Sequence, residues 1–340
     1  MRVNCIVILS LALVLYPRFI DGQYVQDEQH AVSGTYTNPV SDFSLPDPSV
    51  IRADDGWFYL FATENIRNTP ILKSRDLVNW ELTGTAFTDS TRPTFEPKGG
   101  IWAPDINYIA KTYVLYYSMS VWGGEQTCGI GIAISKTPDG PYTDLGKLFR
   151  SNEIDVQNSI DPFFIEDNGH KYLFWGSFHG IYAIELSDDG LKVKTGAQKH
   201  QVAGTAYEGT YILKKDGYYY LFCSTGSCCE GINSTYRTVV GRSDNLFGPY
   251  LDKSGRSMNT NHHEVIIHEN DRFVGTGHNS EIITDNAGKT WILYHAVDKN
   301  KPQGRLLMLD EVQWENWWPF VEGDSPSLEW SKPSFGIKQQ

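Results

Sequence analysis

Asp47-Pro48-Ser49-Val50-Ile51-Arg52, continuing through the turn Asp54-Asp55-Gly56 to Phe58-Tyr59-Leu60-Phe61, is the stretch that decides the fold of this chain. β-Branched and aromatic residues fill both runs, and the Asp-Gly pair between them is typical of a tight turn. The stretch therefore predicts a β-hairpin whose first strand begins at an acid.

The same sequence pattern recurs along the chain, each time with a polar turn and then an aromatic-rich strand. Its five copies begin at Asp47, Trp102, Asp161, Glu208 and Gly277. No convincing helical period separates the copies, and further strand-like runs follow most of them. A repeat of about four strands predicts an all-β fold, a five-bladed β-propeller.

The N-terminus reads as an export signal. Arg2 precedes an apolar run from Ile6 to Tyr16, which is too short for a comfortable membrane span. We therefore expect a signal peptide at residues 1–22 and a secreted or periplasmic protein without membrane insertion. No linker divides the repeats, so residues 33–322 are expected to form one propeller domain, followed by a C-terminal tail at residues 323–340.

Charge and cysteine content narrow the partners. The 340 residues carry a net charge of −12, which argues against nucleic acid as a partner, because a phosphate backbone needs a cationic surface. Four cysteines follow the signal segment: Cys128, Cys223, Cys228 and Cys229. They can form disulfides in an exported protein, but the sequence leaves their pairing open, and no His/Cys spacing around them is typical of a zinc site.

Three of the five copies begin with a carboxylate, at Asp47, Asp161 and Glu208. The start of an innermost blade strand lies near the central channel, so we expect these acids to converge in one pocket. A single Asp-Pro pair is a common turn opener, and that structural reading stays open for each copy alone. Three acids together favour glycoside hydrolysis, in which one carboxylic acid protonates the leaving oxygen and a carboxylate activates water.

Several motifs resemble glycoside hydrolase family 43, in the order expected of that family, from about Asn38 to Pro319. They are Leu45-Pro46-Asp47-Pro48-Ser49, Gly100-Ile101-Trp102-Ala103-Pro104-Asp105, Asn158-Ser159-Ile160-Asp161-Pro162 and Tyr207-Glu208-Gly209. The resemblance implies that Asp47 is the general base and Glu208 the general acid. It also implies that Asp161 raises the pKa of the acid and orients it. An inverting reaction further implies that the base and acid carboxyls stand roughly 6.5 to 9.5 Å apart.

Within the family, the chain is similar to arabinan-cleaving members. The segment Cys228 to Tyr236 and the triplet Gly277-His278-Asn279 carry this likeness, whereas Gly304-Arg305-Leu306 is more like exo-acting members. The implied function is an endo-1,5-α-L-arabinanase that acts on plant cell-wall polysaccharide or oligosaccharide. An exo-acting α-L-arabinofuranosidase or β-xylosidase is the alternative, and a non-catalytic sugar-binding propeller is a further one.

Further site residues follow from the resemblance. Sugar contacts are expected from four residues: Trp102, Asn158, Ser177 and Arg305. His278 is expected beside one hydrated calcium ion in the central channel, and no organic cofactor is expected. Plainer interpretations remain open for two of them, a blade-packing tryptophan at Trp102 and a hydrogen-bonded core histidine at His278.

Overall fold

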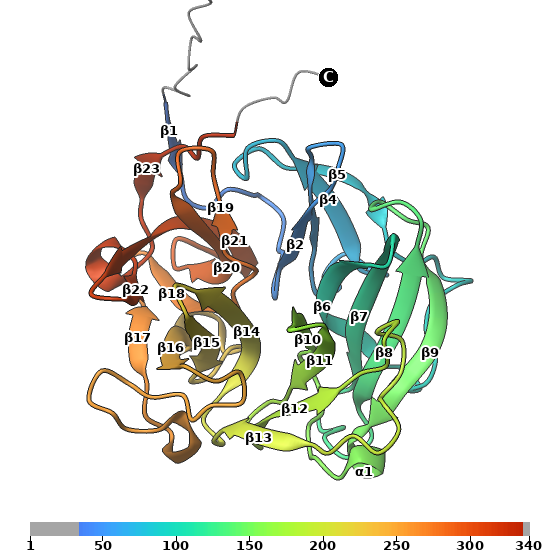
Figure 1. Ribbon diagram of the computed structural model, residues 1–340. Helices are drawn as coiled ribbons and strands as arrows, with labels where there is room; N and C mark the ends of the chain where they lie inside the picture. The colour runs from blue at the N-terminus through green and yellow to red at the C-terminus, as the bar shows by residue number, and fades with distance from the viewer. Residues whose placement is uncertain (1–33, 336–340) are drawn as a thin grey trace, which may run out of the picture. The chain divides into compact units, whose positions relative to one another are not determined.

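The computed structural model describes residues 34–335, and the signal peptide expected at residues 1–22 lies outside them. The described residues belong to one compact unit. Its strands form three separate four-stranded antiparallel sheets, one nine-stranded sheet and one short pair. In Figure 1 these sheets stand around a common centre, with β2, β6, β10 and β14 nearest to it.

The three four-stranded sheets are blades I to III. Blade I contains β2 (Ser49–Arg52), β3 (Phe58–Phe61), β4 (Pro70–Ser74) and β5 (Glu81–Thr85). Blade II contains β6 (Gly100–Ile109), β7 (Thr112–Ser120), β8 (Gly129–Ser135) and β9 (Thr143–Arg150). Blade III contains β10 (Phe163–Asp167), β11 (His170–Trp175), β12 (Ile181–Glu185) and β13 (His200–Ala203).

The nine-stranded sheet holds blades IV and V, which a single parallel contact between Arg237 and Thr276 joins. Blade IV contains β14 (Glu208–Lys215), β15 (Tyr218–Thr225), β16 (Arg237–Ser243) and β17 (Glu264–Ile267). Blade V contains β18 (Phe273–Gly277), β19 (Ile283–Thr284), β20 (Thr290–Asp298), β21 (Lys301–Glu315) and β22 (Trp318–Phe320). Because β18 and β19 both pair with β20, they act as one interrupted inner strand.

Helical segments are few and short among the described residues. They are α1 (Ser151–Ile154), η1 (Gly231–Asn233), η2 (Met258–Thr260) and η3 (Glu322–Asp324). Within residues 34–335, none has the length and apolar character needed to cross a membrane.

The core lies between neighbouring blades. The aromatic-Leu-aromatic runs form the second strand of each blade, and all four residues of β3 are buried. One apolar cluster joins Phe61 and Ile71 of blade I to Ile106 and Leu115 of blade II. Both faces of the second strands are covered by adjacent blades, so these strands are apolar on both sides and do not alternate with polar residues.

Segments from both ends of the described chain close the ring. β1 (Thr35–Thr37) pairs antiparallel with β23 (Glu329–Ser331), and Tyr36 donates a hydrogen bond of 2.6 Å to the carbonyl of Leu309 in blade V. Phe335 packs against Phe58 of blade I with ring centroids 4.8 Å apart. Residues 329–335, which the sequence assigns to a C-terminal tail, are therefore packed onto the blades.

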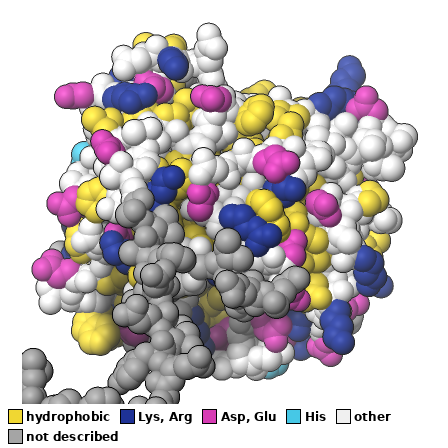
Figure 2. Space-filling view, turned by 90° about the horizontal axis from the view of Figure 1, so that it is seen from above, with side chains coloured by type: hydrophobic (Ala, Val, Ile, Leu, Met, Phe, Trp, Pro, Cys, Tyr) yellow, Lys and Arg dark blue, Asp and Glu magenta, His cyan; other side chains and the backbone are white. Residues whose placement is uncertain are grey.

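The surface carries both signs of charge. On the face in Figure 2, acidic and basic side chains are interspersed among apolar ones. This face therefore presents no single large field of one sign in the part that the view leaves uncovered.

Candidate active site

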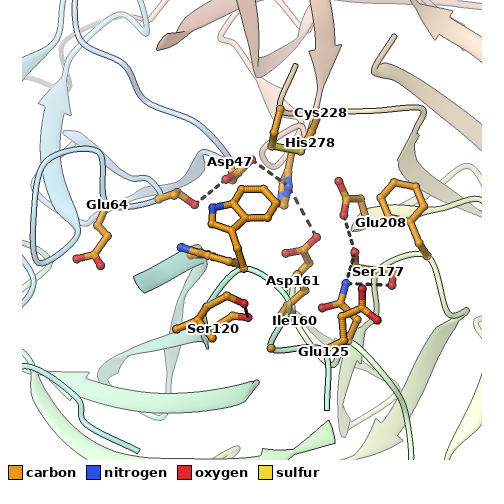
Figure 3. Close-up of a pocket in the computed structure, with 18 of the residues that line it drawn as sticks. Asp47, Glu64, Ser120, Glu125, Ile160, Asp161, Ser177, Glu208, Cys228 and His278 are labelled. Carbon is orange, nitrogen blue, oxygen red and sulfur yellow. Dashed lines mark hydrogen bonds and ion pairs between the residues drawn. A yellow bond between two sulfur atoms is a disulfide. The ribbon is translucent and has the colours of Figure 1, made fainter. Parts of the chain in front are cut away.

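One pocket of about 380 Å³ collects every residue that the sequence singled out for a site. Its lining includes Asp47, Trp102, Asn158, Asp161, Ser177, Glu208, His278 and Arg305. They come from all five blades, and the close-up in Figure 3 shows Asp47, Asp161, Glu208 and His278 gathered in one place. The volume is in the range of small-molecule sites.

Each inner strand is preceded or interrupted by one residue with a left-handed backbone. These residues are Asp47 (φ 57°), Ala103 (φ 38°), Asp161 (φ 60°), Gly209 (φ 63°) and His278 (φ 49°). Such values are uncommon away from glycine, so their recurrence in every blade marks a shared bend at the channel end of the strand.

Glu208 does not occupy the same position in its blade as Asp47 and Asp161, although the sequence repeat aligns the three acids. Asp47 and Asp161 are themselves the left-handed residues, whereas Glu208 stands one position earlier, where blade II has Trp102. A Cβ atom at Gly209 would lie 3.1 Å from Cγ of His278, so little room exists there for a side chain. Glycine adopts positive φ at least cost, and the acid occupies the preceding position.

Hydrogen bonds between blades hold the five left-handed residues. Their backbone N–H groups donate to the neighbouring blade, Ala103 to Thr63 Oγ1 (2.7 Å), Asp161 to Ser118 Oγ (2.8 Å), Gly209 to Asp161 Oδ2 (3.2 Å), His278 to Ser224 Oγ (2.7 Å) and Asp47 to His295 Nδ1 (3.2 Å). Every blade junction thus contributes one such bond. We call this set the inner ring.

Asp47 is held by the guanidinium of Arg305 and by hydrogen-bonding neighbours. Arg305 Nη1 lies 2.9 Å and His278 Nδ1 3.3 Å from its Oδ1, and Thr63 Oγ1 donates to Oδ2 at 2.6 Å. Burial alone raises the pKa of Asp47, but its neighbours, with the guanidinium of Arg305 first among them, hold that pKa well below its ordinary value. The Asp47 carboxylate is therefore ionised at neutral pH.

The two histidines beside Asp47 are neutral. Burial lowers the pKa of His295 to about 4, and burial also lowers the pKa of His278, in both cases with Arg305 adding to the effect. Nδ1 of His295 lies 3.2 Å from the backbone nitrogen of Asp47 and 3.3 Å from its Oδ1.

Glu208 and Asp161 have the opposite character. Burial raises the pKa of Glu208, and burial together with the charges of Glu208 and Asp47 raises the pKa of Asp161. Ser177 Oγ donates to Glu208 Oε2 at 2.6 Å, and Asn158 Nδ2 donates to that hydroxyl at 2.9 Å. The pair therefore retains a proton under conditions in which Asp47 has lost its own.

Two other pocket carboxylates are poorly suited to proton transfer. Glu64 forms a bidentate pair with Arg92, accepts the N–H groups of Asn68 and Ile101, and has a lowered pKa because these donors outweigh burial. Glu125 lies at the exposed edge, 3.5 Å from His179 Nε2. Glu64 thus fixes the loop before β6, and only Asp47, Asp161 and Glu208 combine burial with access to the pocket.

Sequence reasoning missed several residues that this site uses. Thr63 bridges Asp47 to blade II, His295 accepts from Asp47, and the exposed Trp122 lies 5.6 Å from the ring of Trp102. A signal for Thr63 is present, because Thr63, Ser118 and Ser224 each follow the leucine of their repeat by three positions. The other two have no counterpart at equivalent positions.

The calcium ion expected beside His278 stays a prediction. Within residues 34–335, no group of three or more His, Cys, Asp and Glu side chains is placed to hold a metal ion. Calcium prefers six to eight oxygen ligands, so the side chains present do not by themselves fit one, and water would supply most of the shell.

The family model for glycosyl hydrolases family 43 matches residues 36–319. The chain belongs to this family. Family 43 enzymes are inverting glycoside hydrolases, and the predictions of an O-glycoside hydrolase and of a five-bladed propeller are confirmed.

Relatives and solved structures agree with the family assignment. The chain is 36% identical over 305 residues to an extracellular exo-α-(1→5)-L-arabinofuranosidase from Cellvibrio japonicus, with 81% of this chain and 86% of the relative covered. It is 36% identical over 288 residues to an extracellular endo-α-(1→5)-L-arabinanase from Bacillus subtilis, with 81% and 87% covered. The structure of a Cellvibrio cellulosa α-L-arabinanase with arabinohexaose matches with a TM-score of 0.76 and 34% identity, covering 84% of this chain and 97% of that one.

Proposed function

We propose that this protein is a secreted, inverting glycoside hydrolase that cleaves the α-1,5-L-arabinofuranosyl linkages of plant arabinan, in the manner of an endo-arabinanase. Relatives named for this linkage, two of them named extracellular, support the substrate class and the location. A solved relative that holds arabinohexaose supports an oligosaccharide or polysaccharide partner.

The observation that carries the proposal is the opposite electrostatic state of two acids in one pocket. Arg305 and its neighbours keep the pKa of Asp47 low in spite of burial, while burial keeps the pKa of Glu208 high. A pair of acids whose environments separate their pKa values is the pattern of a general base and a general acid.

The proposed reaction is a single displacement. The carboxylate of Asp47 takes a proton from water as that water attacks the anomeric carbon, and Glu208 gives its proton to the departing glycosidic oxygen. Asp161 accepts the N–H of Gly209, which fixes the backbone next to the acid. Trp102, Asn158, Ser177 and Arg305 line the pocket where they can contact the sugar.

The test uses Glu208→Gln. We expect kcat/KM on linear arabinan to fall by about 10² to 10⁴, because proton donation to the leaving oxygen is lost. An aryl arabinofuranoside with a good leaving group needs little protonation, so the loss on that substrate should be much smaller. Glu166→Gln changes an exposed carboxylate of β10 outside the pocket and should leave both rates unchanged. Equal losses on both substrates would remove Glu208 from the acid role.

Exo action is the second candidate. It is favoured by the name of the Cellvibrio japonicus relative and by the triplet Gly304-Arg305-Leu306, which is more like exo-acting members of the family. Early product lengths from linear arabinan distinguish the two. A ladder of oligosaccharides is expected for endo action, and release of one short product from chain ends would assign exo action.

A further inference from the structure

A bond between adjacent cysteines lies in the pocket wall, and the proposed mechanism does not use it. Cys228 and Cys229 form a disulfide, and both residues line the same pocket as Asp47 and Glu208. Figure 3 shows this disulfide next to His278, with Asp47 and Glu208 on either side. Cys128 and Cys223, by contrast, are free and fully buried away from the solvent.

The loop that carries the disulfide is anchored by other contacts. It connects β15 to β16, and Ser234 Oγ donates to the carbonyl of Ser227 at 2.6 Å while the N–H of Ser227 donates to Thr235 Oγ1 at 3.1 Å. Gly226 has φ 92°, and a Cβ there would lie 2.4 Å from the carbonyl oxygen of Thr235. These close contacts hold both ends of the loop together, and a bond between two adjacent cysteines adds no link between those ends.

The chemistry of the disulfide differs from that of the rest of the wall. Asp47, Glu208, Ser177 and Arg305 offer charges and hydrogen bonds, which suit sugar hydroxyls. Two bonded sulfur atoms offer no hydrogen-bond donor and present a compact, polarisable surface, which suits the C–H face of a sugar ring. Sites that combine a few polar groups with apolar surface are the usual way to bind a small ligand in one orientation.

We propose that the Cys228–Cys229 disulfide is a binding surface for a furanose ring next to the bond that is cleaved, and that it contributes to substrate affinity. This inference rests on the proposed function, because it requires an arabinofuranosyl chain in the pocket. The disulfide acts on binding and takes no part in proton transfer, so its loss should raise KM and leave the pH dependence of kcat unmoved.

The test measures binding of arabinohexaose by calorimetry to the Glu208→Gln protein, with and without the additional Cys228→Ser and Cys229→Ser substitutions. We expect the Kd to rise about tenfold or more when the disulfide is absent. Ile232→Ser in the same loop is the matched control, because Ile232 is 51% exposed and does not line the pocket, and it should leave the Kd unchanged. In the active enzyme, the double substitution should raise KM. The acidic and basic limbs of the pH dependence of kcat should stay at the same pH values.

A second measurement keeps all side chains. Treatment of the Glu208→Gln protein with a phosphine reductant adds two electrons and two protons to the disulfide and yields two thiols, which mass spectrometry after alkylation counts. Reduced protein should bind arabinohexaose more weakly, as the double variant does. The buried thiols of Cys128 and Cys223, whose pKa values burial raises, should remain unlabelled in the folded protein.

The outcomes separate this inference from the proposed function. A Kd within twofold of the parent value, whether or not the melting temperature falls, would overturn the inference and leave the disulfide a structural link. Free thiols at Cys228 and Cys229 in protein secreted into an oxidising medium would also overturn it. Failure of the Glu208→Gln protein itself to bind arabinohexaose would instead overturn the proposed function, and this inference with it.

Discussion

At the residue scale, the pocket keeps similar acids in different states by giving them different neighbours. Asp47 has the guanidinium of Arg305 at 2.9 Å, whereas the hydrogen bond to Glu208 comes from the neutral hydroxyl of Ser177 at 2.6 Å. A full charge offsets the cost of burying a carboxylate, and one hydroxyl does so only in part. Arg305 and Ser177 therefore control the two limbs of the pH profile.

Arg305→Gln should move the acidic limb. Arg305 lowers the pKa of Asp47, so its removal raises that pKa, and the base becomes protonated at a higher pH. We expect the acidic limb of the kcat/KM profile to shift upward, with Arg305→Lys shifting it less because the charge is kept. An unmoved limb in Arg305→Gln, even with reduced activity, would mean that Arg305 serves the substrate and not the base.

Ser177→Ala should move the basic limb. The hydroxyl of Ser177 donates to Glu208 and stabilises the ionised form, which lowers the pKa of Glu208. Without that donor the acid keeps its proton to a higher pH, so the basic limb should shift upward while the acidic limb stays in place. The kcat/KM profile measures this, and a downward shift would contradict the assignment of Glu208 as the proton donor.

At the scale of strands, the site depends on how the inner strands begin. The phrase that opens at Asp47 predicts a hairpin in each blade, because alternation and turn residues are local properties of the sequence. The one-residue offset of Glu208 cannot be predicted from these local properties. It arises because His278 of the next blade leaves little room for a side chain at Gly209. Contacts between blades, such as Asp47 with His295, likewise join residues far apart in the chain.

Ser118→Ala tests the inner ring. The hydroxyl of Ser118 accepts the buried N–H of Asp161, and its loss leaves that donor without a partner. We expect the free energy of unfolding to fall by about 1 to 3 kcal/mol. Ser254→Ala removes an exposed hydroxyl and should change it by less than about 0.5 kcal/mol. Chemical denaturation measures both, and equal small effects would show that the inner ring adds little to stability.

At the scale of the whole molecule, the repeat predicted the number of blades but not how the ring closes. Five similar repeats predict five similar units, whereas the pairing of β1 with β23 joins two strands of three residues each from opposite ends of the described chain. Strands so short carry no detectable periodicity. The packing of Phe335 on Phe58 was for the same reason not foreseeable from composition.

Buried carboxyls should make stability depend on pH. Burial raises the pKa of Glu281 from 4.5 to about 7 and that of Asp310 from 3.8 to about 7. At a pH between the ordinary pKa values and the raised values of about 7, these carboxyls hold more protons in the folded state than in the unfolded state. Their contribution to stability is therefore greatest at mildly acidic pH and falls as pH rises toward 7. The melting temperature should decrease from about pH 5 to about pH 8. Glu281→Gln should flatten this dependence, and an increase across the same range would contradict it.

The most direct measurement is the configuration of the first product. Linear arabino-oligosaccharide is mixed with the enzyme, and ¹H NMR follows the anomeric signals of the new reducing end before mutarotation. If Asp47 activates water and Glu208 protonates the leaving oxygen, the α-linkage should yield the β-anomer first. The α-anomer appearing first would mean retention through a covalent intermediate, and would contradict the roles of Asp47 and Glu208.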